Sequence, residues 1–220
     1  MNPLRLFVVS LLCVLLATLL SGCAARPPTA LDGVEVREYK GEKLSSVNDF
    51  RENSIRGPQV VPKETYRLAV SGLVDMPLSL TYDEVVDRPS YSKVVTLHCV
   101  EGWDATILWE GVLIDDLLAH AGVKEGANTL IFHAADGYTS SLALDYVRQN
   151  RILLAGKMND VTLPPERGFP FQVVAEAKWG YKWVKWVTEI EVSNDPSYRG
   201  YWESAGYNNE GDYAGPKYEK

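Results

Sequence analysis

Cysteine is scarce in this chain of 220 residues: only three occur, at positions 13, 23 and 99, and the chain has only three histidines. Three cysteines are too few for an iron–sulfur cluster held by four thiolates, and none of them lie in the spacing of a haem-attachment motif. Zinc is not indicated either, because no second cysteine lies near Cys99 and the histidines are not spaced as a ligand motif.

Basic residues are also in deficit. The chain has 22 Lys and Arg against 29 Asp and Glu, a formal net charge of −7. A general nucleic-acid-binding protein needs a basic face for the phosphates, so we expect no nucleic-acid partner. Hydrophobic residues make up 46% of the chain and charged residues 23%, which excludes a disordered polymer and indicates a globular domain with a core.

One long apolar run lies at the N-terminus. Residues 4–20 are mostly apolar and Arg5 is their only charged residue, a pattern that fits a secretory signal better than a membrane-spanning helix. The run ends in Leu20-Ser21-Gly22-Cys23, which resembles the bacterial lipobox, where the cysteine is acylated. We therefore expect residues 1–22 to be a lipoprotein signal peptide. The mature protein would be exported and lipid-anchored through Cys23 to a bacterial membrane, on its periplasmic or extracellular face. A plain signal peptide is the alternative.

Processing of this kind would leave a single free thiol. Cys13 would leave with the signal peptide and Cys23 would carry lipid, so only Cys99 would remain. Exported domains in an oxidising compartment usually pair their cysteines or do without them. Cys99 is therefore either buried and inert or kept for its chemistry.

The rest of the chain divides into three parts. Residues 23–58 are polar and interrupted by proline and glycine, which predicts a tether and an N-terminal arm. Residues 59–195 form the predicted domain. Residues 196–220 hold six aromatic side chains and almost no aliphatic ones, and we expect this tail to pack on the domain. A frayed tail is the alternative.

The fold class follows from short apolar segments within the domain. Segments that alternate or are rich in β-branched residues predict strands at 66–74, 94–100, 129–134, 171–175 and 183–192. A capping box, Thr81 with Glu84, predicts a short helix, and apolar residues on one face of 113–121 predict a second that ends at Gly122. The sequence thus indicates an α+β fold, mixed and strand-rich, with short helices and long irregular segments.

Cys99 lies where a predicted strand gives way to a glycine-containing turn, a common place for functional residues. A thiolate is a soft ligand, suited to a metal such as molybdenum. A cysteine nucleophile with a histidine base is the other option, although no signature for it is present. His98 should point to the opposite face of the strand, as a packed or hydrogen-bonded residue.

Several separate motifs together resemble the molybdopterin-binding domain of the sulfite oxidase superfamily, over about residues 47–207. The closest branch is the one containing the catalytic subunit of the bacterial periplasmic methionine sulfoxide reductase. The motifs are Cys99-Val100-Glu101-Gly102-Trp103, Trp109-x-Gly111-Val112, Leu163-Pro164-Pro165, Trp179-Gly180-Tyr181-Lys182-Trp183-Val184-Lys185-Trp186 and Gly200-Tyr201-Trp202-Glu203-x-x-Gly206-Tyr207. The resemblance implies a mixed α+β fold and a molybdenum–molybdopterin cofactor whose metal is ligated by Cys99.

The resemblance also implies two groups of cofactor contacts. The segment Trp183, Val184 and Lys185 matches a family stretch that contacts the pterin. In the arm, Asn48, Arg51 and Glu52 match the family segment Asn-Asn-Phe-Tyr-Glu-Phe, which contacts the cofactor as well.

The cofactor phosphate requires cations, for which Lys182, Lys185 and Arg167 are the candidates. Arg167 stands where the reductase branch has Asn or His, and Gln172 where that branch has Arg, so these contacts are expected to be redistributed. The alternative for Lys182 and Lys185 is a strand whose tryptophans cover the core and whose lysines are solvated.

We therefore expect a lipid-anchored molybdenum oxidoreductase that exchanges an oxygen atom with a small substrate such as a sulfoxide. Electrons would come from a separate redox partner protein. Glu101, two residues from the metal ligand, is the second predicted catalytic residue; its carboxylate would orient a water or substrate and disfavour an anion such as sulfite. A sulfite-type oxidase and a cofactor-free lipoprotein that keeps the fold as a binding or scaffold module are the alternatives. Proteins with this cofactor usually leave the cell by the twin-arginine route, whereas Arg5 is the only arginine of this signal.

Overall fold

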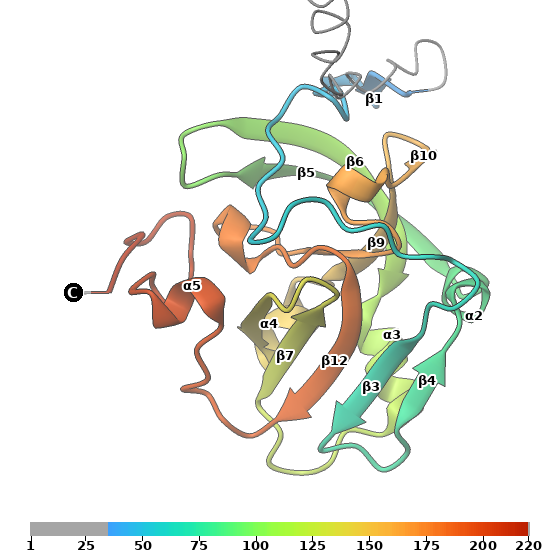
Figure 1. Cartoon of the computed structure of the whole chain (residues 1–220), viewed down its shortest axis with the longest axis vertical. Helices are drawn as coiled ribbons and strands as arrows, with labels where there is room; N and C mark the ends of the chain where they lie inside the picture. Colours follow the sequence, from blue (N-terminus) through green and yellow to red (C-terminus); the bar gives the residue numbers. More distant parts are fainter. Residues whose placement is uncertain (1–34, 220) are drawn as a thin grey trace, which may run out of the picture. The chain divides into compact units, whose positions relative to one another are not determined.

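Two five-stranded β-sheets dominate the computed structural model, which describes residues 35–219 (Figure 1). The predicted signal peptide and the lipobox with Cys23 lie outside the described residues. No helix within residues 35–219 has both the length and the apolar character needed to cross a membrane.

The first sheet has the order β10-β9-β6-β5, with β11 also paired to β9, and all of its pairs are antiparallel. Its long strands β5 and β6 form a hairpin whose connection, residues 99–103, contains Cys99. The strands are β5 (Ser90–His98), β6 (Asp104–Leu113), β9 (Leu153–Met158), β10 (Val161–Thr162) and β11 (Gln172–Val174).

The second sheet has the order β4-β3-β12-β7-β8. The pair β3–β12 is parallel and the other pairs are antiparallel. The strands are β3 (Leu68–Gly72), β4 (Leu78–Leu80), β7 (Thr129–Ala134), β8 (Thr139–Ala143) and β12 (Val187–Ser193).

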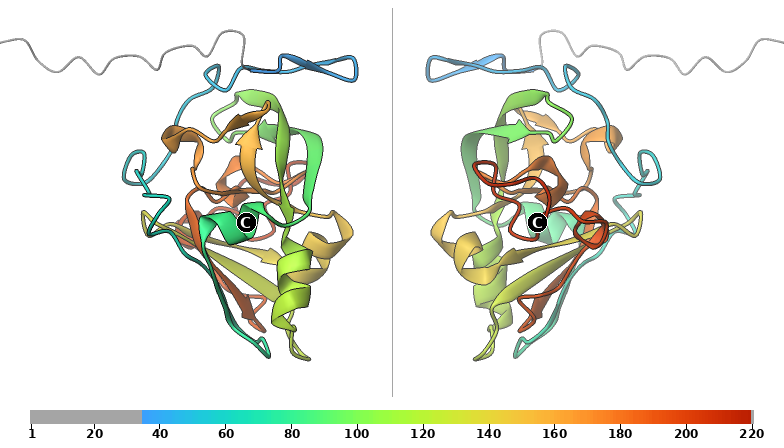
Figure 2. Two further views of the ribbon diagram at one scale, coloured as in Figure 1. Left: turned by 90° about the vertical axis from the view of Figure 1, so that its right-hand side faces the viewer. Right: turned by 90° about the vertical axis from the view of Figure 1, so that its left-hand side faces the viewer.

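Short elements cover the sheets (Figure 2). The helix α3 packs against the core through a buried apolar face that includes Ile114, Leu117 and Leu118. Full burial of each such side chain contributes about 1.5 to 3 kcal/mol relative to exposure. The remaining elements are β1 (Glu38–Tyr39), β2 (Glu42–Lys43), α2 (Tyr82–Val86), α3 (Ile114–Ala121), α4 (Leu144–Gln149), α5 (Tyr201–Ser204) and the 3-10 turns η2 (Pro165–Arg167) and η3 (Gly180–Lys182).

The α+β, strand-rich prediction is confirmed. The capping box of α2 is present in both directions, and Gly122 ends α3 in the left-handed conformation with φ 71°. The expected strand at 183–192 begins only at Val187, because the preceding residues form η3 and an irregular segment in which Trp186 has φ 51°. Strands β6, β8 and β9 lie outside the predicted segments, since they lack a clean alternation of apolar and polar residues along their length, and the short strands β4 and β10 lie outside these segments as well.

Candidate functional site

Cys99 lies at the tip of the β5–β6 hairpin. Its amide donates to the carbonyl oxygen of Trp103 at 2.9 Å, and the Gly102 amide donates to the Cys99 carbonyl oxygen at 3.0 Å. Gly102 has φ 90°, which favours glycine at this position of the turn. The turn leaves the Cys99 side chain against a cavity, and the residue is only 6% exposed.

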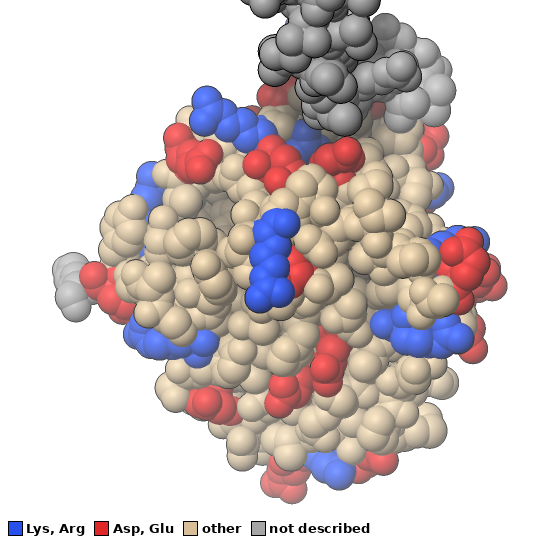
Figure 3. All heavy atoms as spheres, viewed as in Figure 1, with Lys and Arg blue, Asp and Glu red and all other residues tan. Residues whose placement is uncertain are grey.

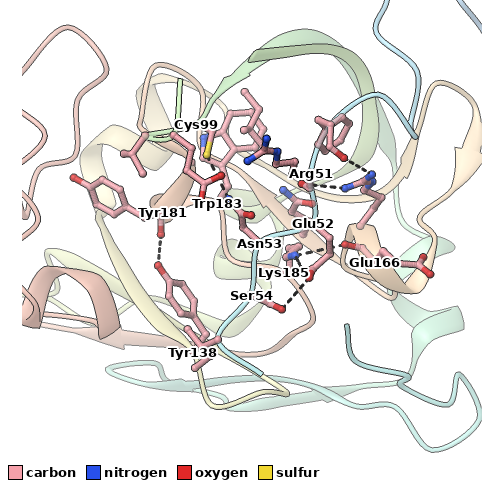
Figure 4. Close-up of a pocket in the computed structure, with 18 of the residues that line it drawn as sticks. Arg51, Glu52, Asn53, Ser54, Cys99, Tyr138, Glu166, Tyr181, Trp183 and Lys185 are labelled. Atoms are coloured by element: carbon pink, nitrogen blue, oxygen red, sulfur yellow. Dashed lines mark hydrogen bonds and ion pairs between the residues drawn. The ribbon is translucent and has the colours of Figure 1, made fainter. Parts of the chain in front are cut away.

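The cavity has a volume of about 410 Å³. We call residues 47–57 the strap, and its part from Phe50 onward forms one wall of the cavity. The other walls are the hairpin tip, residues near η3, and the C-terminal tail (Figure 4). In Figure 3 the molecular face is hollowed between the hairpin, the strap and the tail. Many of the lining side chains are aromatic: Phe50, Trp103, Tyr138, Tyr181, Trp183, Trp186, Trp202 and Tyr207.

The sulfur of Cys99 receives a hydrogen bond from the strap. Asn53 Nδ2 lies 3.6 Å from Cys99 Sγ. Burial raises the pKa of the Cys99 thiol; hydrogen bonds from the Glu101 amide and from Asn53 oppose this shift, as does the charge of Lys217. The charge of the Glu101 carboxylate, like burial, raises the pKa of the Cys99 thiol. The site thus offers a soft, largely buried sulfur with two N–H donors that favour its anionic form.

Arg167 fixes the strap. Its guanidinium donates to the carbonyl oxygens of Val47 at 2.7 Å, Phe50 at 2.7 Å and Arg51 at 3.3 Å. It also lies over the Phe50 ring, 4.0 Å from the centroid. Burial lowers the pKa of Arg167. The residue therefore uses three of its five N–H groups to position the backbone of the strap.

Lys185 holds the strap at a second point, through an ion pair with Glu52 (Figure 4). Its ammonium also lies 4.3 Å from the ring centroid of Trp186. Burial lowers the pKa of Lys185, and the hydrogen bond with Glu52 opposes this shift. The ion pair leaves little free positive charge at this wall.

Acidic and basic groups are mixed around the cavity. The lining acids are Glu52, Glu101, Asp136 and Glu166, and the lining bases are Arg51, Arg167 and Lys185. A further cation comes from the tail, where Lys217 Nζ donates to the Val100 carbonyl oxygen at 3.2 Å. Sequence analysis alone finds no basic residue near Cys99, because Lys217 and Arg51 are distant in the chain.

The structure brings seven of the predicted site residues to the cavity and leaves three elsewhere. Those that line it are Cys99, Glu101, Arg51, Glu52, Arg167, Trp183 and Lys185. Their functional roles stay predictions. Asn48 is exposed and Val184 is buried in the core, and neither lines the cavity.

The position of Lys182 corrects the sequence-based interpretation. Its ammonium is fully buried and paired with Glu203 at 2.7 Å, so it points into the protein and not into the cavity. His98, in contrast, is hydrogen-bonded as expected: its Nδ1 lies 2.7 Å from Asp104 Oδ1, and its ring stacks on Tyr213 with centroids 3.7 Å apart.

Sequence reasoning missed Asn53, Trp103 and the tail residues Trp202 and Tyr207 as lining residues. The aromatic composition of the tail was the available signal for the last two. Nothing in the sequence distinguishes Asn53 from Asn48, because only the path of the strap decides which amide reaches Cys99.

Comparison with known proteins gives a consistent set of matches. A family model described as "Oxidoreductase molybdopterin binding domain" matches residues 56–202. The uncharacterized oxidoreductase YuiH of Bacillus subtilis (strain 168) is 38% identical over 148 residues, 67% of this chain and 74% of YuiH. The putative protein-methionine-sulfoxide reductase subunit YedZ1 of Azospira oryzae is 36% identical over 149 residues, 67% of this chain and 56% of that protein.

More distant relatives include the mitochondrial sulfite oxidase of Homo sapiens, which is 30% identical over 188 residues, 72% of this chain and 34% of the oxidase. Among solved structures, the sulfane dehydrogenase SoxCD from Paracoccus pantotrophus matches with a TM-score of 0.61 and 26% identity, over 63% of this chain and 41% of that chain. The chain thus spans about half of the YedZ1 relative and about a third of the sulfite oxidase.

Proposed function

Because this chain belongs to the family of oxidoreductase molybdopterin-binding domains, and is thus an oxidoreductase that uses a molybdenum–molybdopterin cofactor, we propose that it exchanges an oxygen atom with a small neutral sulfoxide. One observation carries the proposal. Cys99, the only cysteine of residues 35–219, is presented at a hairpin tip to a cavity of about 410 Å³.

The residues present fit this cofactor. Within residues 35–219 no three His, Cys, Asp or Glu side chains gather as a metal site, so a metal here would depend on Cys99 and on ligands that the protein does not supply. The indole N–H of Trp103 is buried at the cavity and has no hydrogen-bond partner among the described residues, which leaves a donor for an acceptor on the pterin. Arg51 and the unused N–H groups of Arg167 could meet the phosphate.

When bound, the cofactor supplies two-electron oxygen-atom transfer. The chain's own residues then have distinct tasks. Cys99 would hold the metal, and the N–H groups of Asn53 and Glu101 stabilise the charge on its sulfur. Arg167 and the pair Lys185–Glu52 hold the strap against the cavity, whose walls carry many aromatic side chains. The Glu101 carboxylate, exposed beside Cys99, can accept a hydrogen bond from a water or a substrate.

Two features support a neutral substrate. The Glu101 carboxylate repels an anion, and the charge of Lys185 is already paired with that of Glu52. The similarity to the putative protein-methionine-sulfoxide reductase subunit points in the same direction. Lys217 and Arg51 favour a second candidate, oxidation of sulfite, because they place positive charge near the hairpin tip.

Electrons would come from a separate redox protein, since Cys99 is the only cysteine that residues 35–219 offer to any redox cluster. We also propose that Cys23 carries a lipid and anchors the exported protein to a membrane. The lipobox-like segment Leu20-Ser21-Gly22-Cys23 supports this part of the proposal.

The test of the proposal is a comparison of substrates. Methionine sulfoxide turnover is measured with a reduced viologen as donor, and sulfite turnover with an artificial electron acceptor. The proposal expects a higher kcat/KM for the sulfoxide. A higher kcat/KM for sulfite would replace the sulfoxide proposal with the oxidase, and a protein that turns over neither substrate while loaded with cofactor would contradict both.

A further inference from the structure

Lys182 and Glu203 form an ion pair that solvent does not reach. Lys182 Nζ lies 2.7 Å from Glu203 Oε1, and both side chains are 0% exposed. Lys182 also donates to the carbonyl oxygen of Ser141 at 3.0 Å, and the Ser140 hydroxyl donates to Glu203 Oε1 at 2.5 Å. The pair therefore joins three elements that are distant in sequence: η3, β8 and α5.

A stabilising role alone explains this pair poorly. Desolvation of two charges costs about as much as their attraction returns, and replacing both partners by apolar residues is often neutral or stabilising. Glu203 Oε2 is buried and has no hydrogen-bond partner among the described residues, so the desolvation is only partly compensated. The contribution of the pair is positional: its hydrogen bonds fix α5 at one place on β8.

The chain neighbours of both residues line the cavity. Tyr181 and Trp183 flank Lys182, and Trp202 precedes Glu203. α5 has only four residues and cannot be stable without tertiary contacts. Gly200, directly before it, lies so close to β8 that a Cβ atom would collide with the Thr139 carbonyl oxygen. The docking of α5 on β8 thus depends on a close backbone approach and on the ion pair.

The tail continues from this docking point along the cavity. The ring of Tyr207 meets that of Tyr181 edge to face, with centroids 5.1 Å apart, and the Tyr181 hydroxyl donates to the Asn208 carbonyl oxygen at 2.7 Å. Gly211 lies against the aliphatic stem of Lys182. Lys182 is therefore enclosed by the same segment that Glu203 anchors.

We propose that Lys182 and Glu203 are positioning residues for substrate binding: their ion pair holds residues 200–219 on β8 and so fixes the cavity wall formed by Tyr181, Trp183 and Trp202. This role replaces contact with the cofactor phosphate for Lys182. It rests on the proposed function only in taking the cavity as the place where substrate binds.

The test uses a double variant, Lys182→Met with Glu203→Leu, which removes both charges. We expect an unfolding midpoint in urea close to wild type and an unchanged molybdenum and pterin content. We also expect a KM for methionine sulfoxide raised about tenfold to a hundredfold with little change in kcat, as misplacement of binding groups produces. Trypsin should cut faster after Arg199 and Lys217. The matched control, Arg148→Met with Asp115→Leu, removes an exposed ion pair and should change none of these quantities.

Three results would overturn the inference. A double variant with wild-type KM and wild-type cleavage would show that the pair only fills the core. Loss of molybdopterin from Lys182→Met and from the double variant would restore the phosphate-binding role. Failure of the double variant to fold would show that the pair is needed for stability itself. If the wild type binds no cofactor, the proposed function fails, while the cleavage rates still decide whether the pair holds the tail.

Discussion

The side-chain amide of Asn53 lies 3.6 Å from the sulfur of Cys99, and this contact ties the strap to the tip of the β5–β6 hairpin. It connects two segments that are 46 residues apart in sequence. Because the amide donates to the sulfur, the position of the strap bears directly on the chemistry of the thiol.

Asn53→Ala should raise the pKa of Cys99 in the cofactor-free protein. The Asn53 N–H lowers the pKa of the thiol against the larger effect of burial, so its loss leaves the thiolate less stabilised. The measurement is the rate of alkylation by iodoacetamide against pH, whose midpoint should move to higher pH. The midpoint is used because it does not depend on access to the cavity. Asn48→Ala, at an exposed position outside the cavity, serves as control. An unchanged midpoint in Asn53→Ala would show that the Asn53 amide does not stabilise the Cys99 thiolate.

Arg167→Met should destabilise the protein by about 2 to 3 kcal/mol, because the strap carbonyl oxygens of Val47, Phe50 and Arg51 lose their donor. Urea unfolding followed by tryptophan fluorescence measures the loss. Arg51→Met, at an exposed residue, should change the free energy of unfolding by no more than about 0.5 kcal/mol. Equal effects of the two substitutions would mean that Arg167 does not anchor the strap.

Glu101→Gln tests the charge at the mouth of the cavity. Removal of the carboxylate should raise kcat/KM for sulfite relative to that for methionine sulfoxide, by roughly three- to tenfold for a partly solvated charge. The kcat/KM values for sulfite and for methionine sulfoxide are measured in wild type and variant at low ionic strength, and their ratio is compared. Glu166→Gln, which removes a second lining acid on the other side of the cavity from Cys99 (Figure 4), is the control for net charge. If the ratio stays constant in Glu101→Gln, the carboxylate does not select substrate charge.

Cys23→Ala should abolish incorporation of a labelled fatty acid and release the protein from the membrane fraction, since the cysteine thiol is the proposed site of acylation. Ser21→Ala keeps a small residue before the cysteine and should be labelled like the wild type. Equal labelling of Cys23→Ala and wild type would exclude the lipobox interpretation.

Much of the fold could be predicted because it depends on local patterns. The α2 capping box, the end of α3 at Gly122 and the strand that leads to Cys99 are each encoded within a few neighbouring residues. The glycine-containing turn after Cys99 is local as well, which is why the sequence identified the most informative residue of the site.

The partners of the charged residues could not be predicted, because they are set by tertiary contacts. Lys182 and Lys185 look alike in the segment from Trp179 to Trp186, yet one pairs with Glu203 in the core and the other with Glu52 at the cavity. The same limit applies to Arg167, whose guanidinium binds backbone oxygens of a segment about 120 residues earlier.

Metal content tests the central claim most directly. The protein is purified from a host that makes molybdopterin, and molybdenum and pterin are quantified per chain in wild type and in Cys99→Ser, with folding of both checked by circular dichroism. The account predicts about one molybdenum per wild-type chain and its loss from the folded Cys99→Ser variant, because a hydroxyl is a poor ligand for a soft site. A folded wild type without molybdenum, or a Cys99→Ser variant that retains it in full, would contradict the assignment of Cys99 as the metal ligand.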